Sequence, residues 1–312
     1  MRNSLIVSSL TLFLFCGAGL ADINGDGRTV LCFVGQQTSH GFGKHEYSAG
    51  NHLIAEWLSE TFPEHSIEAR HAIPWPEDPE TFYEGADAVI FFATGGDRHP
   101  VNGKVPDFDR VMRTGAGLAC LHYGVEVPIG PSAKGMLAWM GGYFEKNWSV
   151  NPHWVASFEV FDEHPVSRGV EPFAIDDEWY FHMRFVEGMK GVTPILSAVA
   201  PSETMKRKDG PHSGNPTVRA AVAAGEPQHV AWAYQRGDDY NSGRGFGFTG
   251  LHYHWNWEND SFRKTALNGV AWVAGLEIPE QGIETETPSR EMLTANAVEH
   301  GGEQKGMPEV KR

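Results

Sequence analysis

The sequence predicts an α/β protein built on a mostly parallel central sheet. In the first half of the chain, short apolar runs alternate with stretches of helical periodicity. Such a strand, helix, strand order is typical of parallel sheets, because each helix carries the chain back to the edge where the next strand begins. The run at residues 28–35 is almost wholly apolar, as expected of a strand that is covered on both faces.

The first half is predicted to contain four strands and two helices. Residues 28–35 form an apolar run that ends in glycine, and residues 47–62 carry apolar side chains at three- and four-residue intervals. The first pattern is typical of a buried strand and the second of a helix with one apolar stripe. The other predicted elements are strands at 66–70, 86–96 and 115–124 and a helix at 107–113.

The second half has a different pattern. Residues 153–161, 192–200 and 228–236 resemble strands without a long helix between them, so we expect extra or antiparallel strands in the middle of the chain. The run that begins at Gly243 predicts one more buried strand. A last helix opens on Asn259 and Asp260, which suit helix capping, and it closes a domain predicted to span residues 28–276.

Both termini are predicted to lie outside this domain. Residues 1–21 have a basic start, an apolar stretch and a small-residue exit at Ala21, which indicates a secretory signal and not a stable membrane span. The protein is therefore expected to be secreted or periplasmic, although a lipid on Cys16 is an alternative. Residues 277–312 are acidic and show little periodicity, which predicts a disordered tail.

Composition limits the possible partners. The formal net charge is −15, and no cluster of Lys and Arg is evident, so a nucleic-acid partner is not expected. The 15 histidines and 10 tryptophans suit metal or proton chemistry and the stacking of sugars. Cys32 and Cys120 lie in apolar runs and are expected to be small buried residues, with a disulfide between them possible but not expected.

Polar and titratable side chains follow several of the predicted strands. Because ligands of open parallel sheets bind beyond the carboxyl ends of the strands, these positions are candidates for a site. They are His40, His45 and Glu46 after the first strand, Asp97 after the third, His122 after the fourth, and His252 and His254 after the last.

Five motifs resemble the ThuA-like (trehalose utilisation) family of the class I glutamine amidotransferase-like superfamily. They occur in family order within residues 28–276 and are SHGFGKHEYSAG, DAVIFFATGGD, GAGLACLHYG, HPVSRGVEPFAIDDEWY and GRGFGFTGLHYHW. The resemblance implies a flavodoxin-like three-layer sandwich and an association with sugar metabolism.

The resemblance to the superfamily also implies that this chain lacks two catalytic residues of its glutaminases, the nucleophilic cysteine and the late glutamate. Its glutaminases carry a nucleophilic cysteine at the tight turn after a central strand, and a late His-x-Glu completes the triad. Here His122 takes the turn position, and His252 is followed by His254 in place of the glutamate. Hydrolysis of an amide through a thioester is therefore not expected.

The candidate residues fall into three groups, each weighed against a role in packing alone. The predicted catalytic residues are His122, His252, His45, Glu46 and Glu178. The predicted substrate-binding residues are His40, Asp97, Trp179, Tyr180, His254 and Trp255. The alternatives for a cofactor are none or a divalent metal such as zinc, with His122, Glu178, His182 and His252 as the predicted ligands of that metal.

Three functions are compatible with these residues. The first is an enzyme that acts on a sugar or a 3-keto-glycoside by His/Glu acid–base chemistry, with or without a metal, as an isomerase, lyase or hydrolase. The second is a carbohydrate-binding module without turnover. A hydrolase of the amidotransferase type ranks last, because its cysteine and glutamate are missing.

Overall fold

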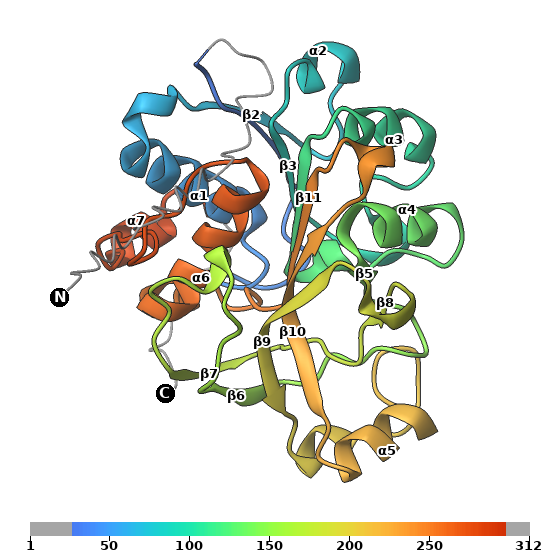
Figure 1. Cartoon of the computed structure of the whole chain (residues 1–312). Coiled ribbons are helices and arrows are strands. Elements are labelled where there is room, and N and C mark those ends of the chain that lie inside the picture. The colour runs from blue at the N-terminus through green and yellow to red at the C-terminus, as the bar shows by residue number, and fades with distance from the viewer. Residues whose placement is uncertain (1–26, 298–312) are drawn as a thin grey trace, which may run out of the picture.

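The structure is a computed structural model that describes residues 27–297 (Figure 1). The predicted signal at residues 1–21 and the end of the predicted tail, residues 298–312, lie outside the described residues. Within residues 27–297, none of the helices has the length and apolar character needed to cross a membrane.

A seven-stranded sheet forms the centre of the molecule, in the order β2-β1-β3-β4-β11-β10-β9. The first five strands of this order are parallel, whereas β10 is antiparallel to both of its neighbours. The strand bounds are β1 (Val30–Val34), β2 (Glu68–Ala72), β3 (Ala88–Phe92), β4 (Gly117–Leu121), β9 (Val192–Val199), β10 (Pro227–Gln235) and β11 (Arg244–Phe248). The predicted mostly parallel sheet with added antiparallel pairing is confirmed.

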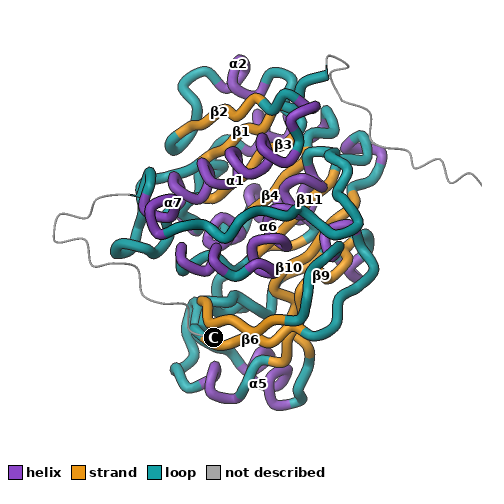
Figure 2. Tube along the Cα trace, turned by 90° about the vertical axis from the view of Figure 1, so that its left-hand side faces the viewer, coloured by secondary structure: helices purple, strands orange, loops and turns teal. Residues whose placement is uncertain are grey.

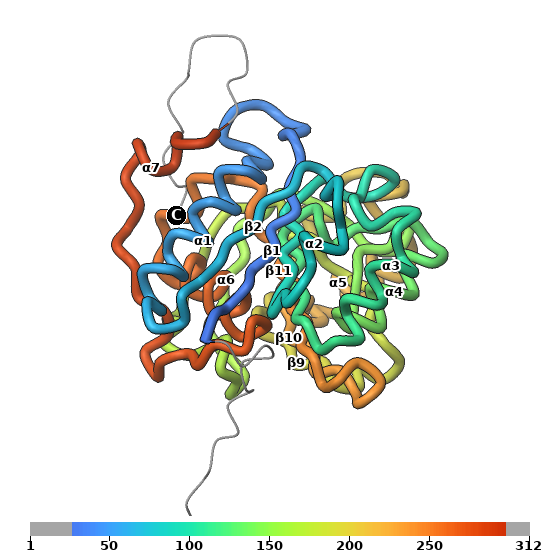
Figure 3. Tube along the Cα trace, turned by 90° about the horizontal axis from the view of Figure 1, so that it is seen from above, coloured from blue at the N-terminus to red at the C-terminus, as the bar shows by residue number. Residues whose placement is uncertain are grey.

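Helices cover both faces of the sheet, which completes the predicted three-layer sandwich (Figures 1 and 3). One face carries α1 (Tyr47–Thr61) and α6 (Asp260–Val273), and the other carries α3 (Val105–Arg113) and α4 (Pro131–Met140). Two separate apolar cores result, one on each face. The strands β1, β3 and β4 are buried along their whole length, as their uninterrupted apolar sequences predict.

Smaller elements surround the sandwich. The predicted strand at 153–161 is present as β6 (Trp154–Phe158), but it pairs with β7 (Phe173–Asp177) in a separate two-stranded ladder. The remaining elements are α2 (Pro79–Tyr83), α5 (Pro216–Ala223), and the short pair β5 (Gly142–Tyr143) and β8 (Arg184–Phe185). The ladder has a functional consequence, since β7 leads directly into Glu178.

The prediction of a disordered tail from residue 277 is wrong for residues 277–297. This segment, here called the C-terminal strap, runs along α6 and ends in α7 (Arg290–Thr294), on the same side of the molecule as α1 (Figure 2). Ile278, Ile283 and Leu293 are buried at 2%, 1% and 0% exposure. Three isolated apolar anchors and hydrogen bonds to α6 therefore hold a segment that has no apolar stripe.

Candidate functional site

Four side chains converge at the edge of the sheet where the parallel strands end. His45 follows β1, His122 follows β4, His252 follows β11 and Glu178 follows β7. One donor atom of each residue lies within 4.8 Å of those of the other three. We call these four residues the His3Glu cluster. The strand exits thus bring together residues as far apart in sequence as His45 and His252, which are 207 positions apart.

The donor atoms of the His3Glu cluster are almost in contact. Nε2 of His45 lies 2.9 Å from Nδ1 of His252 and 3.1 Å from Nε2 of His122. Oε2 of Glu178 lies 3.1 Å from Nδ1 of His252 and 3.6 Å from Nε2 of His122. The three imidazoles are buried, and the Glu178 side chain keeps 12% exposure. The cluster is therefore compact and reaches solvent at one point.

Hydrogen bonds behind the cluster fix the orientation of two imidazoles. Nδ1 of His122 lies 2.8 Å from the carbonyl oxygen of Thr249, which can only accept, so this nitrogen carries the proton. Nε2 of a neutral His122 then directs its lone pair into the cluster. Nδ1 of His45 lies 2.6 Å from the hydroxyl of Tyr47, which leaves Nε2 to face the same point.

The backbone turns sharply at two of these histidines, His45 and His122. His45 and His122 adopt φ angles of +52° and +49°, a left-handed conformation that is uncommon for residues other than glycine. The turn after β4 is also crowded, because a Cβ at Gly124 would lie 2.5 Å from the carbonyl oxygen of Phe91. Strained backbone of this kind is held where the surrounding fold over-determines it, and it is frequent at functional sites.

A buried carboxylate, Asp177, holds the two chain segments that supply His252 and Glu178. One oxygen accepts the backbone N–H groups of Glu178 at 2.7 Å and His252 at 3.0 Å. The other accepts the N–H of Leu251 at 3.0 Å and the side-chain amide of Asn256 at 2.8 Å. Leu251 has a φ of +85°, so Asp177 stabilises the unusual turn that presents His252.

Two polar neighbours hold Glu178. Its Oε1 accepts a hydrogen bond of 3.0 Å from the side-chain amide of Asn151. The hydroxyl of Tyr180 lies 3.4 Å from Oε2 and 3.2 Å from Nε2 of His122. Tyr180, predicted to bind substrate, thus lies directly against the cluster. Sequence reasoning missed Asn151, which precedes a predicted strand instead of following one.

The surroundings of His45, His252 and Glu178 favour two neutral imidazoles beside an ionised carboxylate. Burial, together with the neighbouring His122 and His252, lowers the pKa of His45 far below its ordinary value, and burial lowers the pKa of His252 to about 4. Burial alone would raise the pKa of Glu178, but its interactions with the neighbouring His122 and His252 hold that pKa well below its ordinary value. Neutral imidazoles with free lone pairs and a carboxylate are the forms that bind metal ions.

The His3Glu cluster fits a divalent metal. Ligand atoms bound to one ion at about 2.0–2.2 Å lie about 3.0–3.6 Å apart. Four of the donor distances here run from 2.9 to 3.6 Å, Nε2 of His45 lies 4.0 Å from Oε2 of Glu178, and all the donor atoms lie within 4.8 Å of one another. Three imidazoles and one carboxylate suit zinc and similar transition metals. The hydrogen bond behind His122 is the outer contact that metal-ligating histidines usually make.

Two more histidines border the open side of the cluster. The ring of His40 stacks on His45 with centroids 3.8 Å apart, and His40 is an exposed residue. His153 is 45% exposed, with Nε2 at 3.9 Å from Oε1 of Glu178 and its ring 4.7 Å from that of His252. His40 was predicted from the strand exit, whereas His153 was missed because it begins a predicted strand instead of following one.

Three predicted site residues lie apart from the cluster. Oε1 of Glu46 accepts a hydrogen bond of 2.8 Å from the backbone N–H of Gly43, so it braces the loop before α1. His182, predicted as a metal ligand, instead turns to Trp148, with Nδ1 at 3.0 Å from that residue's carbonyl oxygen. The side chain of Asp97 is 77% exposed. His45, not His182, completes the set of four donors.

The aromatic residues predicted to contact substrate lie mainly in the core. Trp179 is fully buried and packs against phenylalanine rings. Trp255 is 7% exposed and stacks on Tyr253, with centroids 4.5 Å apart. His254 is buried, and burial lowers the pKa of its ring to about 4. None of these three contacts the His3Glu cluster.

The features of a glutaminase are absent from the turn after β4. Cys120 is fully buried within β4, and burial raises the pKa of its thiol above the ordinary range. It lies two residues before the turn that His122 occupies. An inaccessible thiol of raised pKa is a poor nucleophile, so this cysteine does not replace a catalytic one.

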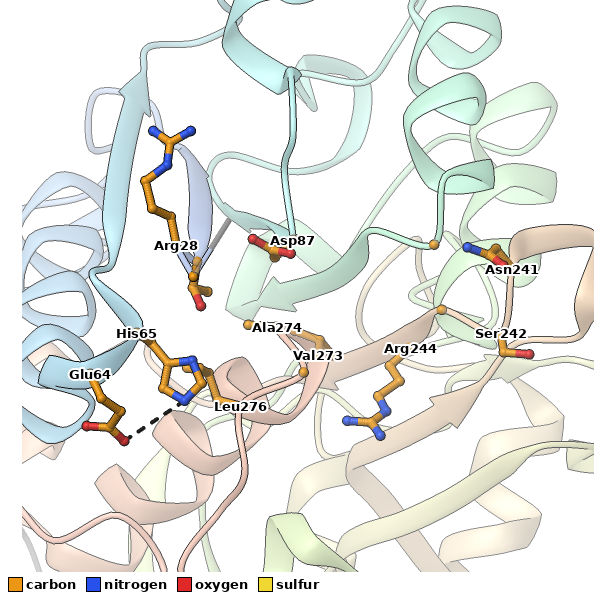
Figure 4. Close-up of a pocket in the computed structure, with 15 residues that line it drawn as sticks. Arg28, Glu64, His65, Asp87, Asn241, Ser242, Arg244, Val273, Ala274 and Leu276 are labelled. Atoms are coloured by element: carbon orange, nitrogen blue, oxygen red, sulfur yellow. Dashed lines mark ion pairs between the residues drawn. The ribbon is translucent and has the colours of Figure 1, made fainter. Parts of the chain in front are cut away.

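A separate cavity of 550 Å³ lies at the other end of the sheet, beside the residues that precede β1, β3 and β4 (Figure 4). Its lining includes Arg28, Asp87 and Arg244, and an ion pair of 3.9 Å joins Glu64 to His65. The lining of this cavity includes one imidazole, that of His65. The opposite edge of the sheet instead brings three imidazoles together around the carboxylate of Glu178. The candidate site is therefore the His3Glu cluster.

Comparison with known proteins agrees with the motifs. The family model for ThuA, described as trehalose utilisation, matches residues 30–273. The chain belongs to the ThuA family. This ThuA-family chain is similar in fold to a ThuA-like protein from Bacteroides uniformis, with 16% identity, a TM-score of 0.50, and coverage of 79% of this chain and 91% of that one.

A second similar structure is the glutaminase domain of Trypanosoma brucei CTPS with bound acivicin. It has 9% identity and a TM-score of 0.43, and the match covers 81% of the ThuA-family chain and 97% of that domain. No curated protein matches the chain. The family match over residues 30–273 and the similar fold of the ThuA-like protein confirm the family and the fold predicted from the motifs.

Proposed function

We propose that this ThuA-family protein is an enzyme that acts on a keto-bearing sugar or glycoside and holds a divalent metal such as zinc in the His3Glu cluster. The convergence of three imidazole nitrogens and one carboxylate oxygen at the ligand-binding edge of the sheet carries the proposal. Membership of a family described as trehalose utilisation supports a sugar as the substrate.

The chemistry follows from the acidity of a carbon next to a carbonyl group. A divalent cation held by His45, His122, His252 and Glu178 would supply Lewis-acid stabilisation of the negative charge that forms on the carbonyl oxygen when the neighbouring C–H loses its proton. His40 and His153 stand on the open side of the cluster, and burial lowers the pKa of each, so both are neutral at neutral pH and able to accept that proton.

Proton exchange in deuterated water tests this function. The purified protein, with zinc or with chelator, is incubated with disaccharides and their 3-keto derivatives. We expect deuterium to enter the carbon next to the carbonyl only with the keto-sugars and only with metal, as measured by NMR. Binding without exchange would instead favour a carbohydrate-binding module, and no interaction with any sugar would contradict the proposal.

Matched histidine variants test the cluster itself. His122→Asn and His252→Asn should lose bound metal, measured by elemental analysis, and lose exchange while they keep the native circular dichroism spectrum. Asparagine tolerates the left-handed φ at His122 better than most residues. His182→Asn is the control, because His182 also has a positive φ but faces Trp148. Equal loss in all three variants would exclude a specific metal role.

A further inference from the structure

A second histidine–carboxylate pair lies beside the His3Glu cluster. Nε2 of His212 lies 3.0 and 3.2 Å from the two carboxylate oxygens of Glu126. The Glu126 side chain is 3% exposed and that of His212 is 30% exposed. A nearly buried carboxylate thus holds one nitrogen of a ring that still reaches solvent.

The fold constrains both members of the pair. The His212 ring stacks on Phe144 with centroids 5.4 Å apart and an interplanar angle of 23°. A Cβ atom added at Gly96 would lie 3.1 Å from Oε1 of Glu126, so a larger residue at that position would crowd the carboxylate. The backbone oxygen of His212 accepts a hydrogen bond of 3.0 Å from the N–H of Asn151.

One layer of side chains separates the pair from the cluster. Asn151, which binds the backbone of His212, donates its side-chain amide to Oε1 of Glu178 at 3.0 Å. Phe144, which stacks on His212, packs against Tyr180 at 5.3 Å. His212 is therefore linked to Glu178 through Asn151, and its ring is linked to Tyr180 through Phe144.

The hydrogen bond to Glu126 leaves the second ring nitrogen for a ligand. Within residues 27–297, Nδ1 of His212 makes no hydrogen bond, whereas Nε2 is held by the carboxylate. A carboxylate on one side of an imidazole stabilises the imidazolium, which can give up a proton from the other side. The pair has the arrangement of a proton donor set apart from the metal-binding residues.

We propose that His212, positioned by Glu126, is the acid that protonates the departing oxygen when a keto-glycoside is cleaved at this site. The inference rests on the proposed function and narrows it from proton exchange to cleavage by elimination. An isomerisation moves one proton between adjacent atoms and needs one acid–base group, whereas an elimination needs a proton acceptor at carbon and a separate donor at the leaving oxygen.

The step balances as follows. The base removes the proton from C2, next to the C3 carbonyl, and the C–H electron pair becomes the C1=C2 double bond. The bond from C1 to the glycosidic oxygen breaks with its electron pair on oxygen, and Nδ1–H of His212 gives that oxygen a proton. The products are an unsaturated keto-sugar and a free alcohol, and His212 is left neutral with Nε2–H on Glu126.

Leaving-group dependence tests the proposal. The 3-keto glucosides of methanol and of 4-nitrophenol differ in how much the departing oxygen needs a proton. His212→Gln should lower kcat/KM for the methyl glycoside about 100-fold, with a much smaller loss for the 4-nitrophenyl glycoside and unchanged deuterium exchange at C2. Glu126→Gln should give a smaller loss with the same dependence. His229→Gln, a half-buried histidine bonded to Ser197, is the control.

The outcomes separate this inference from the function on which it rests. Equal loss with both leaving groups, or loss of exchange together with cleavage, would assign His212 a structural role and overturn the inference. Wild-type protein that exchanges deuterium but cleaves neither glycoside would overturn it while leaving the proposed function standing. Protein that neither exchanges nor cleaves would overturn both.

Discussion

At the scale of single residues, Asp177 has the largest predicted effect on the geometry of the site. Each of its two oxygens accepts two N–H groups, and three of the four donors are backbone groups of Glu178, Leu251 and His252. Burial raises the pKa of Asp177 to about 6, against the opposing effects of His122 and these hydrogen bonds. Both oxygens of the Asp177 carboxylate are thus occupied, each by two hydrogen-bond donors.

Replacing Asp177 with asparagine should destabilise the protein. The new amide nitrogen would face two N–H groups and leave them without an acceptor in a buried place, so Asp177→Asn should cost about 2–4 kcal/mol of the free energy of unfolding. Urea denaturation measures the loss. Asp176→Asn is the control, because that side chain is partly exposed and should change stability by less than about 0.5 kcal/mol. Similar losses in both variants would contradict this role.

The sequence predicted the cluster residues that follow strands and missed those placed by loops. His45, His122 and His252 were found from strand exits, and Glu178 from its motif. His182 comes four residues after Glu178, yet its φ of +56° turns the ring toward Trp148. Left-handed turns and contacts between distant loops leave no periodic pattern, so residues such as His153 and His212 emerge only from the structure.

At the scale of elements, the C-terminal strap shows how a segment without periodicity can pack. Its buried residues Ile283 and Leu293 are ten positions apart, which is too far to form a stripe on one helix. Asn268 of α6 instead accepts the N–H of Ile283 at 2.9 Å, and Ser289 caps α7. Hydropathy patterns detect apolar faces of helices and strands from the regular spacing of their residues. They therefore miss single buried apolar residues such as Ile283 and Leu293.

A substitution in α7 tests whether the strap contributes to stability. Leu293 is fully buried, and Leu293→Ala should lower the free energy of unfolding by about 2 kcal/mol, the low end for buried leucines, because a terminal helix can partly close the gap. The control is Glu291→Ala in the same helix, whose side chain is exposed. Thermal unfolding compares the two, and equal melting temperatures would show that α7 adds nothing.

At the scale of the whole molecule, the sandwich could be predicted because three strands of its parallel half, β1, β3 and β4, are apolar and buried along their whole length. The pairing of the later strands could not. β6 alternates buried and exposed residues, which identifies a strand with one covered face but not its partner. β6 pairs with β7 in a separate ladder outside the main sheet. Because β7 ends at Asp177, this ladder places Glu178 beside the strand exits.

A count of thiols tests both the burial of the cysteines and the processing of the chain. We propose that the protein is exported and cleaved near Ala21, which would remove Cys16 and leave Cys32 and Cys120. Both are free and buried, and β3 separates their strands in the sheet. Burial raises the pKa of Cys32 to about 12 and that of Cys120 still further, so neither thiolate forms near neutral pH.

The folded, exported protein should therefore not react with a thiol reagent such as 5,5′-dithiobis(2-nitrobenzoic acid). After unfolding in guanidinium chloride without reductant, the reagent should detect two thiols per chain, and mass spectrometry should give Asp22 as the first residue. Three thiols would mean that Cys16 is retained. No thiol would mean that Cys32 and Cys120 form a disulfide, which requires β3 to leave its place between β1 and β4. A thiol that reacts quickly in the folded protein would contradict the buried position of β1 or β4, because the reagent reaches only thiolates that solvent can reach.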